Sequence, residues 1–108
     1  LTTNAPALAM FGARLLPLDD LLATADVVTL HVPLTPETNN LIDAARLSRM
    51  KHSALLINTS RGEVVDELAL LAALRDHKIA GAALDVRSTE PPAPSEFDSL
   101  PNVILLPH

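Results

Sequence analysis

Four short apolar runs, separated by longer and more polar segments, constrain the fold of this chain most strongly. Three of them are nearly continuously apolar and do not alternate with polar residues. Strands that are covered on both faces have this pattern, and the strands of parallel sheets are covered in this way. The runs predict four buried strands, at residues 27–32, 54–58, 80–86 and 103–106.

The segments between these runs carry signals for helices. Thr35, Pro36 and Glu37 have the pattern of an N-cap, a first-turn proline and a first-turn acid, which predicts a helix start. Asp43 and Asp66 are likewise placed to cap helices. Three further helices are predicted at residues 18–25, 44–50 and 67–77, the last with Leu68, Leu71, Ala72 and Leu74 on its buried face.

The alternation of helices and strands predicts the fold class. This order is typical of an α/β protein whose parallel strands are joined by right-handed crossovers. Residues 13–16 are a further candidate strand, and residues 88–101, which contain four prolines, are predicted to form a loop. Because parallel sheets usually have more than four strands, we expect neighbouring strands to be missing from this chain.

Composition excludes several classes of function. The chain has no cysteine, which excludes a disulfide scaffold, a zinc–thiolate site and a cysteine nucleophile, and no metal site is predicted. A net charge of −5 and only two aromatic residues argue against nucleic acid and anionic membranes as partners. No apolar run reaches the roughly 18 residues of a membrane span. Three widely separated glycines cannot form a glycine-rich phosphate loop.

Polar residues follow the predicted strands, where open α/β sheets bind their ligands. Three of these residues have the chemistry to reduce a 2-oxo acid. Arg61 offers a planar fork for a carboxylate, and His108 can deliver a proton near neutral pH. Glu90, if it lay beside His108, would stabilise the charged imidazolium. A cofactor would then have to supply the hydride.

Each of these residues also has a purely structural interpretation. Arg61 could be a surface or ion-paired arginine, and Glu90 could be a solvated loop residue. His31 could be a histidine that is hydrogen-bonded at a strand end, and Asp85 could cap a turn. Taken alone, His108 is only weak evidence for a catalytic site. The residues therefore gain weight from occurring together in one pattern.

Four motifs carry that pattern, and together they closely resemble the D-isomer-specific 2-hydroxyacid dehydrogenase family. They are VVTLHVPLTPETNNLI, LLINTSRGEVVDELALLAAL, IAGAALDV followed three residues later by EPP, and PNVILLPH. They occur in the family's order, and the resemblance covers residues 18–108, about a third of a typical member's length. Leu106 departs from the pattern, because the family more often has threonine there.

The resemblance implies roles for individual residues. Arg61 matches the arginine that binds the substrate, His108 the acid/base, and Glu90 the partner of that histidine. The cofactor implied is NAD, with NADP left open. Its implied contacts are His31, Val32, Pro33, Thr38, Thr59, Ser60, Arg61, Asp85 and His108.

The resemblance also implies a Rossmann-like fold that is incomplete in this chain. Residues 1–108 match the C-terminal portion of a dinucleotide-binding domain, without the glycine-loop half and without the substrate domain. We expect the intact protein to be a cytoplasmic homodimer that transfers hydride between NAD(H) and a small 2-hydroxy or 2-oxo acid. We expect the isolated fragment to be inactive, and to dimerise or aggregate through its uncovered strand edge. The alternatives are an NAD-sensing, corepressor-like binding module and a truncated remnant without activity.

Overall fold

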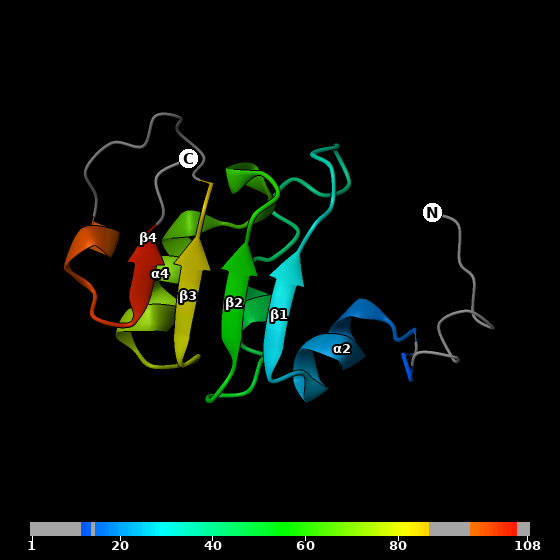
Figure 1. Ribbon diagram of the computed structural model, residues 1–108, viewed down its shortest axis with the longest axis horizontal. Helices are drawn as coiled ribbons and strands as arrows, with labels where there is room; N and C mark the ends of the chain where they lie inside the picture. The colour runs from blue at the N-terminus through cyan, green and yellow to red at the C-terminus, as the bar shows by residue number, and fades with distance from the viewer. Residues whose placement is uncertain (1–11, 14, 87–95, 106–108) are drawn as a thin grey trace.

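Four parallel strands form one sheet in the computed structural model, which describes residues 12–13, 15–86 and 96–105 (Figure 1). The strands lie in the order β1-β2-β3-β4, so that each crossover leads to the adjacent strand. The α/β fold class predicted from the alternation is therefore confirmed. The strands are β1 Val27–Leu30, β2 Leu55–Asn58, β3 Gly81–Leu84 and β4 Val103–Leu105.

The register of the strands places their carboxyl ends side by side, at the same level of the sheet. Leu30 pairs with Asn58, Asn58 pairs with Leu84, and Leu84 pairs with Leu105. The segments that leave β1, β2 and β3 therefore start side by side at one edge of the sheet. We refer to this edge as the carboxyl edge.

Two strands are shorter at this edge than the apolar runs predict. The first run extends to residue 32 and the third to residue 86, whereas β1 ends at Leu30 and β3 ends at Leu84. The reason is that β2, which lies between them, leaves the sheet after Asn58. The residues that continue β1 and β3 then have no partner on β2 for a parallel ladder.

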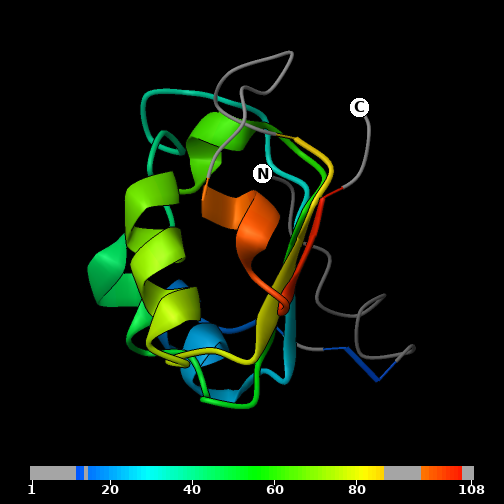
Figure 2. The ribbon, with the colours of Figure 1, turned by 90° about the vertical axis from the view of Figure 1, so that its left-hand side faces the viewer.

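The described helices lie on one side of the sheet (Figure 2). Two predicted caps are confirmed: Asp43 Oδ1 accepts a hydrogen bond from Arg46 N at 3.0 Å, and Asp66 Oδ1 accepts one from Ala69 N at 3.2 Å. The α-helices are α2 Leu18–Thr24, α3 Ala44–Leu47 and α4 Glu67–Arg75, and the 3₁₀ helices are η1 Gly62–Val64 and η2 Glu96–Ser99. None of the described helices has the length and hydropathy of a membrane span.

Three details of the helix predictions are wrong. The segment after Thr35 forms turns and no helix, and Asn40, with φ of 51°, has a left-handed conformation that a right-handed helix cannot include. Both α3 and α4 end earlier than predicted. Past the end of α4, His77 has φ of 54° and Lys78 N donates to Ala73 O at 2.9 Å, as in a Schellman cap.

The buried face of α4 also differs from the predicted face. Leu70, Ala73 and Leu74 are buried, whereas Leu68 is 81% exposed. Of the four residues predicted to be buried, only Leu74 is fully so. Periodicity could not identify the buried face of α4, because apolar residues surround most of this helix. The residues that are buried still have the three- and four-residue spacing of one helical face.

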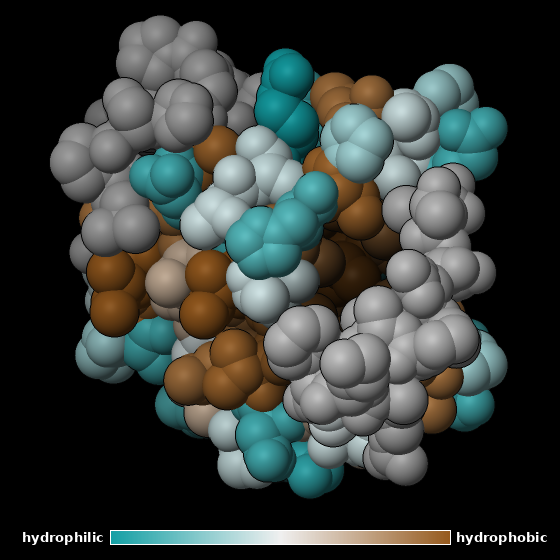
Figure 3. All heavy atoms as spheres, turned by 45° about the vertical axis from the view of Figure 1, so that its right-hand side comes forward, coloured by the Kyte–Doolittle hydropathy of each residue, from teal (hydrophilic) through white to brown (hydrophobic). Residues whose placement is uncertain are grey.

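One hydrophobic core lies between the sheet and its helices. Its fully buried members include Leu22, Ile42, Leu47, Leu56, Leu70, Leu74 and Ile79. The opposite face of the sheet is uncovered in the described part of the chain, although the apolar runs predict strands that are buried on both faces. Val27, Leu55 and Ile104 are 51%, 43% and 63% exposed there, and hydrophobic side chains gather on this face (Figure 3).

We expect the isolated 108-residue chain to self-associate through this face or through the edge at β1. A contiguous apolar surface on a sheet, next to a strand that has only one described neighbour, favours association. Sedimentation velocity should detect dimers or larger species, and Ile104→Lys should shift the distribution toward monomer. Leu68→Lys, on the outer side of α4, is the control that leaves association unchanged. A monomeric wild-type chain would contradict this prediction.

Candidate functional site

A hollow of about 570 Å³ opens at the carboxyl edge, between the segments that follow β1 and β2. The first segment contributes a mostly apolar wall, and the second contributes hydroxyl groups and a guanidinium. The lining residues are His31, Val32, Pro33, Leu34, Thr59, Ser60 and Arg61. All of them except Leu34 belong to the site predicted from the sequence.

Hydrogen bonds hold the second segment in place. Asn58 Oδ1 accepts from Ser60 N at 3.1 Å and from Ser60 Oγ at 2.8 Å, and Asn58 Nδ2 donates to Arg61 O at 3.0 Å. Side chains of asparagine commonly fold the backbone into a turn in this way. The side chain of Arg61 is exposed, and it forms no ion pair with any carboxylate in the described ranges. Arg61 therefore combines a constrained backbone with an accessible guanidinium.

His31 bridges the ends of β1 and β2. Its Nε2 lies 2.9 Å from Thr29 Oγ1, and its Nδ1 lies 3.4 Å from Thr59 Oγ1. A hydroxyl group can donate or accept, so both contacts suit either neutral tautomer of the ring. His31 thus lines the hollow, and it is also the hydrogen-bonded histidine of the structural interpretation.

Thr38 holds the first segment in a compact turn through two hydrogen bonds of its hydroxyl group. Thr38 Oγ1 donates to Pro33 O at 2.6 Å and accepts from Thr35 N at 2.7 Å. Thr38, which the resemblance places among the cofactor contacts, is not among the residues that line the hollow. Its hydroxyl instead holds Pro33, which does line it.

Asp85 is not among the residues that line this hollow. Asp85 follows β3, is partly buried, and its N donates to Asn58 O at 3.0 Å. Glu90 and His108 lie outside the described residues. Sequence reasoning missed Leu34 and Asn58. Asn58 could have been found from its position, because a polar amide that ends an apolar strand just before Thr-Ser-Arg indicates a side-chain turn.

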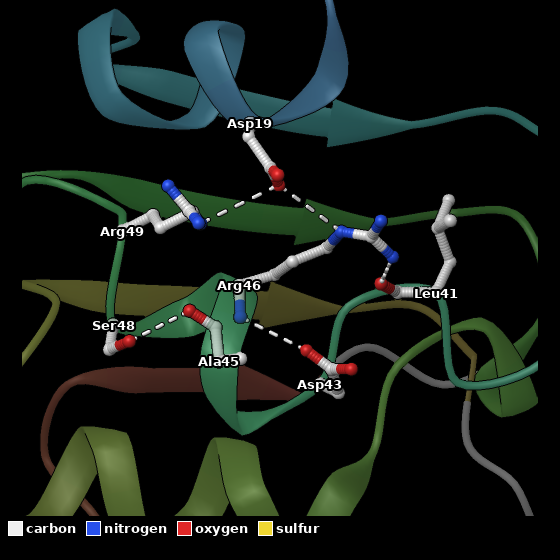
Figure 4. Close-up of polar contacts among 7 residues, drawn as sticks. All are labelled: Asp19, Leu41, Asp43, Ala45, Arg46, Ser48 and Arg49. Carbon is white, nitrogen blue, oxygen red and sulfur yellow. Dashed lines mark hydrogen bonds and ion pairs between the residues drawn. The ribbon is translucent and has the colours of Figure 1, made fainter.

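Two other arginines form ion pairs away from this hollow (Figure 4). Arg46 Nε and Arg49 Nε lie 3.4 Å and 3.7 Å from Asp19 Oδ1, and Arg46 Nη1 donates to Leu41 O at 2.9 Å. These contacts join α2 to α3 and to the turn after it, and Arg46 also holds the segment before α3. Their charged groups are partly exposed, so each pair contributes at most about 1 kcal/mol of stability.

Comparison with known proteins decides the family. The model for the NAD-binding domain of D-isomer specific 2-hydroxyacid dehydrogenases matches residues 2–108. The chain belongs to this family. The resemblance found in the four motifs is thereby confirmed, and so is the Rossmann-like character of the fold.

Individual relatives agree with this assignment. The chain is 53% identical over 97 residues to a glycerate dehydrogenase of Methylorubrum extorquens, covering 87% of this chain and 31% of the relative. Its structure matches a D-lactate dehydrogenase from Sporolactobacillus with a TM-score of 0.89 and 44% identity, covering 97% of this chain and 36% of that one. The chain therefore spans about a third of the length of the proteins that it matches.

The lining of the hollow fits part of a dinucleotide, the group that the domain of this family binds. Val32, Pro33 and Leu34 offer an apolar wall for a planar ring, and Thr59 and Ser60 offer hydroxyl groups opposite it. Its volume falls in the range of about 300–1,000 Å³ that is common for small-molecule sites. A 2-hydroxyacid dehydrogenase from Xanthobacter autotrophicus Py2, solved with NADPH, matches with a TM-score of 0.80 and 47% identity, covering 84% of this chain and 38% of that one. A second structural match, a 2-hydroxyacid dehydrogenase from Lactobacillus delbrueckii, is an NAD complex with a TM-score of 0.85 and 37% identity, covering 96% of this chain and 36% of that one, so both dinucleotides occur among the relatives.

Proposed function

We propose that this chain is the nicotinamide-side portion of the NAD-binding domain of a longer dehydrogenase. That protein would transfer hydride between NAD(H) and C2 of a 2-hydroxy or 2-oxo acid. The observation that carries the proposal is the exposed guanidinium of Arg61, held on a hydrogen-bonded turn at the carboxyl edge beside the hollow. The glycine-loop half and the substrate domain would come from the rest of the longer protein.

The proposed chemistry assigns one task to each of three residues. Arg61 binds the substrate carboxylate through two parallel N–H donors, which fixes the orientation of C2. His108 delivers a proton to the carbonyl oxygen during reduction and removes it during oxidation. Glu90 stabilises the protonated form of His108. NAD(H), when bound, supplies or accepts the hydride.

The cofactor contacts divide into a wall and a polar side. Val32 and Pro33 support one face of the nicotinamide, while Thr59 and Ser60 offer hydrogen bonds to its polar edge. Asp85 is assigned to the carboxamide. The described contacts of Thr38 support a positioning role, since its hydroxyl holds Pro33 O.

Turnover by the longer protein is the test of this proposal. NADH oxidation should be observed spectrophotometrically with at least one of glyoxylate, hydroxypyruvate and pyruvate. The isolated 108-residue chain should show none, because it spans about a third of its relatives' length and contains no glycine-rich phosphate loop. Tight NADH binding without turnover by the longer protein would instead favour the binding module, and the absence of both would favour the inactive remnant.

Sedimentation of the longer protein tests its oligomeric state. We propose a homodimer, which should give a single species of twice the monomer mass.

A further inference from the structure

We infer that Asn58 is a positioning residue for Arg61, and that it sets the affinity of the site for the substrate carboxylate. This inference rests on the proposed function, because it assumes that Arg61 binds substrate. Asn58 itself is buried and faces the loop, so its effect is exerted through the backbone that it holds.

Asn58 is the one buried side chain of polar or charged type in the described part of the chain, at 1% exposure. A buried amide is tolerated only when its donors and acceptors are paired. All of its side-chain hydrogen bonds go to the two residues that bring Arg61 to the site: two are accepted from Ser60, and one is donated to Arg61 O. The side chain therefore serves the loop and makes no hydrogen bond elsewhere in the described core.

The backbone of Asn58 is anchored on both sides. It pairs with Leu30 of β1 and with Leu84 of β3, and its carbonyl accepts from Asp85 N at 3.0 Å. It is thus the last residue of a strand that has a neighbouring strand on each side. The side chain of Asn58 therefore extends from a fixed backbone position and can hold the following loop in place.

The carbonyl of Arg61 is held from two directions. It accepts from Asn58 Nδ2 at 3.0 Å and from Val64 N at 3.2 Å, and Val64 is fully buried in the core. These two bonds fix the point from which the exposed guanidinium extends. Bidentate recognition of a carboxylate requires such a fixed origin, because small displacements of a binding group reduce catalysis steeply.

The chemistry of the turn requires an amide at this position. Its oxygen accepts from Ser60 while its nitrogen donates to Arg61 O, and the amide supplies these two functions from two separate atoms of one planar group. Ionised aspartate keeps the acceptor and loses the donor. Asn58→Asp therefore removes the bond to Arg61 selectively and leaves both bonds from Ser60.

The chain offers a matched control at the other end of the sheet. Asn102 is also an asparagine whose Nδ2 donates to a backbone carbonyl, that of Leu74, at 3.3 Å. It directly precedes β4, on the side away from the carboxyl edge. Asn102→Asp removes a bond of the same kind without touching the turn that carries Arg61.

The experiment compares these variants in the longer protein. We expect Asn58→Asp to raise KM for the 2-oxo acid by about tenfold. The Kd for NADH should change by less than about twofold, which is less than the loss of one hydrogen bond to the cofactor would cause. Asn102→Asp should lower Tm and leave KM unchanged. Asn58→Ser, which introduces no buried charge and has no group that reaches Arg61 O, should repeat the rise in KM.

Two results separate the failure of this inference from the failure of the proposed function. If folded Asn58→Asp and Asn58→Ser proteins keep the wild-type KM while Arg61→Ala loses turnover, then Asn58 has no positioning role and the function stands. If Arg61→Ala keeps turnover and KM, then the proposed function itself is wrong, and the inference about Asn58 falls with it.

Discussion

Arg61→Ala is expected to lower kcat of the longer protein by roughly two to three orders of magnitude, the loss typical when a charged or hydrogen-bonding group at the reacting centre is removed. The guanidinium lies exposed beside the hollow and forms no ion pair with the described carboxylates. Its removal eliminates a charge-assisted pair with the substrate carboxylate. Steady-state NADH oxidation measures the loss. His108→Ala should lower kcat by orders of magnitude for a different reason, since it removes the proton donor.

Two further arginine variants make this prediction specific. Arg61→Lys keeps the charge but loses the planar fork, so its kcat should lie between those of the wild type and Arg61→Ala. Arg49→Ala removes an exposed arginine whose partner is Asp19 at 3.7 Å, far from the hollow, and should leave kcat unchanged. Near-normal turnover by both Arg61→Ala and His108→Ala, with cofactor bound, would refute the assignment of these residues.

Leu56→Ala is expected to lower the free energy of unfolding by about 2–5 kcal/mol. Leu56 is fully buried on β2, which has strands on both sides, and its side chain belongs to the core beneath the helices. The truncation removes apolar contacts and leaves a cavity that a parallel sheet with two flanking strands closes poorly. Urea denaturation at a fixed protein concentration measures the change, because self-association makes stability depend on concentration.

Leu68→Ala is the matched control for this change. It has the same chemistry at a side chain that is 81% exposed on α4, and surface substitutions of this kind change stability by less than about 0.5 kcal/mol. Equal losses for Leu56→Ala and Leu68→Ala would mean that the core does not lie where the structure places it.

Several parts of the fold could be predicted because their signals are local. The apolar runs identify all four described strands, and Asp43 and Asp66 cap the helices that they were predicted to cap. The boundaries at Leu30 and Leu84 could not be predicted. They depend on where the neighbouring strand β2 turns away, which is a property of the sheet and not of either run.

The candidate site likewise has features that the sequence predicts and features that only the tertiary structure shows. By itself the sequence determined the family and the parallel α/β class, and it named six of the seven residues that line the hollow, because motifs and strand ends consist of consecutive residues. Only the tertiary structure decided the buried face of α4, the uncovered face of the sheet and the role of Asn58. These depend on register: pairing with Leu30 and Leu84 fixes Asn58 in the sheet, and its amide can then hold Arg61. No local pattern contains that pairing, since it joins residues about 30 positions apart in the chain through backbone hydrogen bonds.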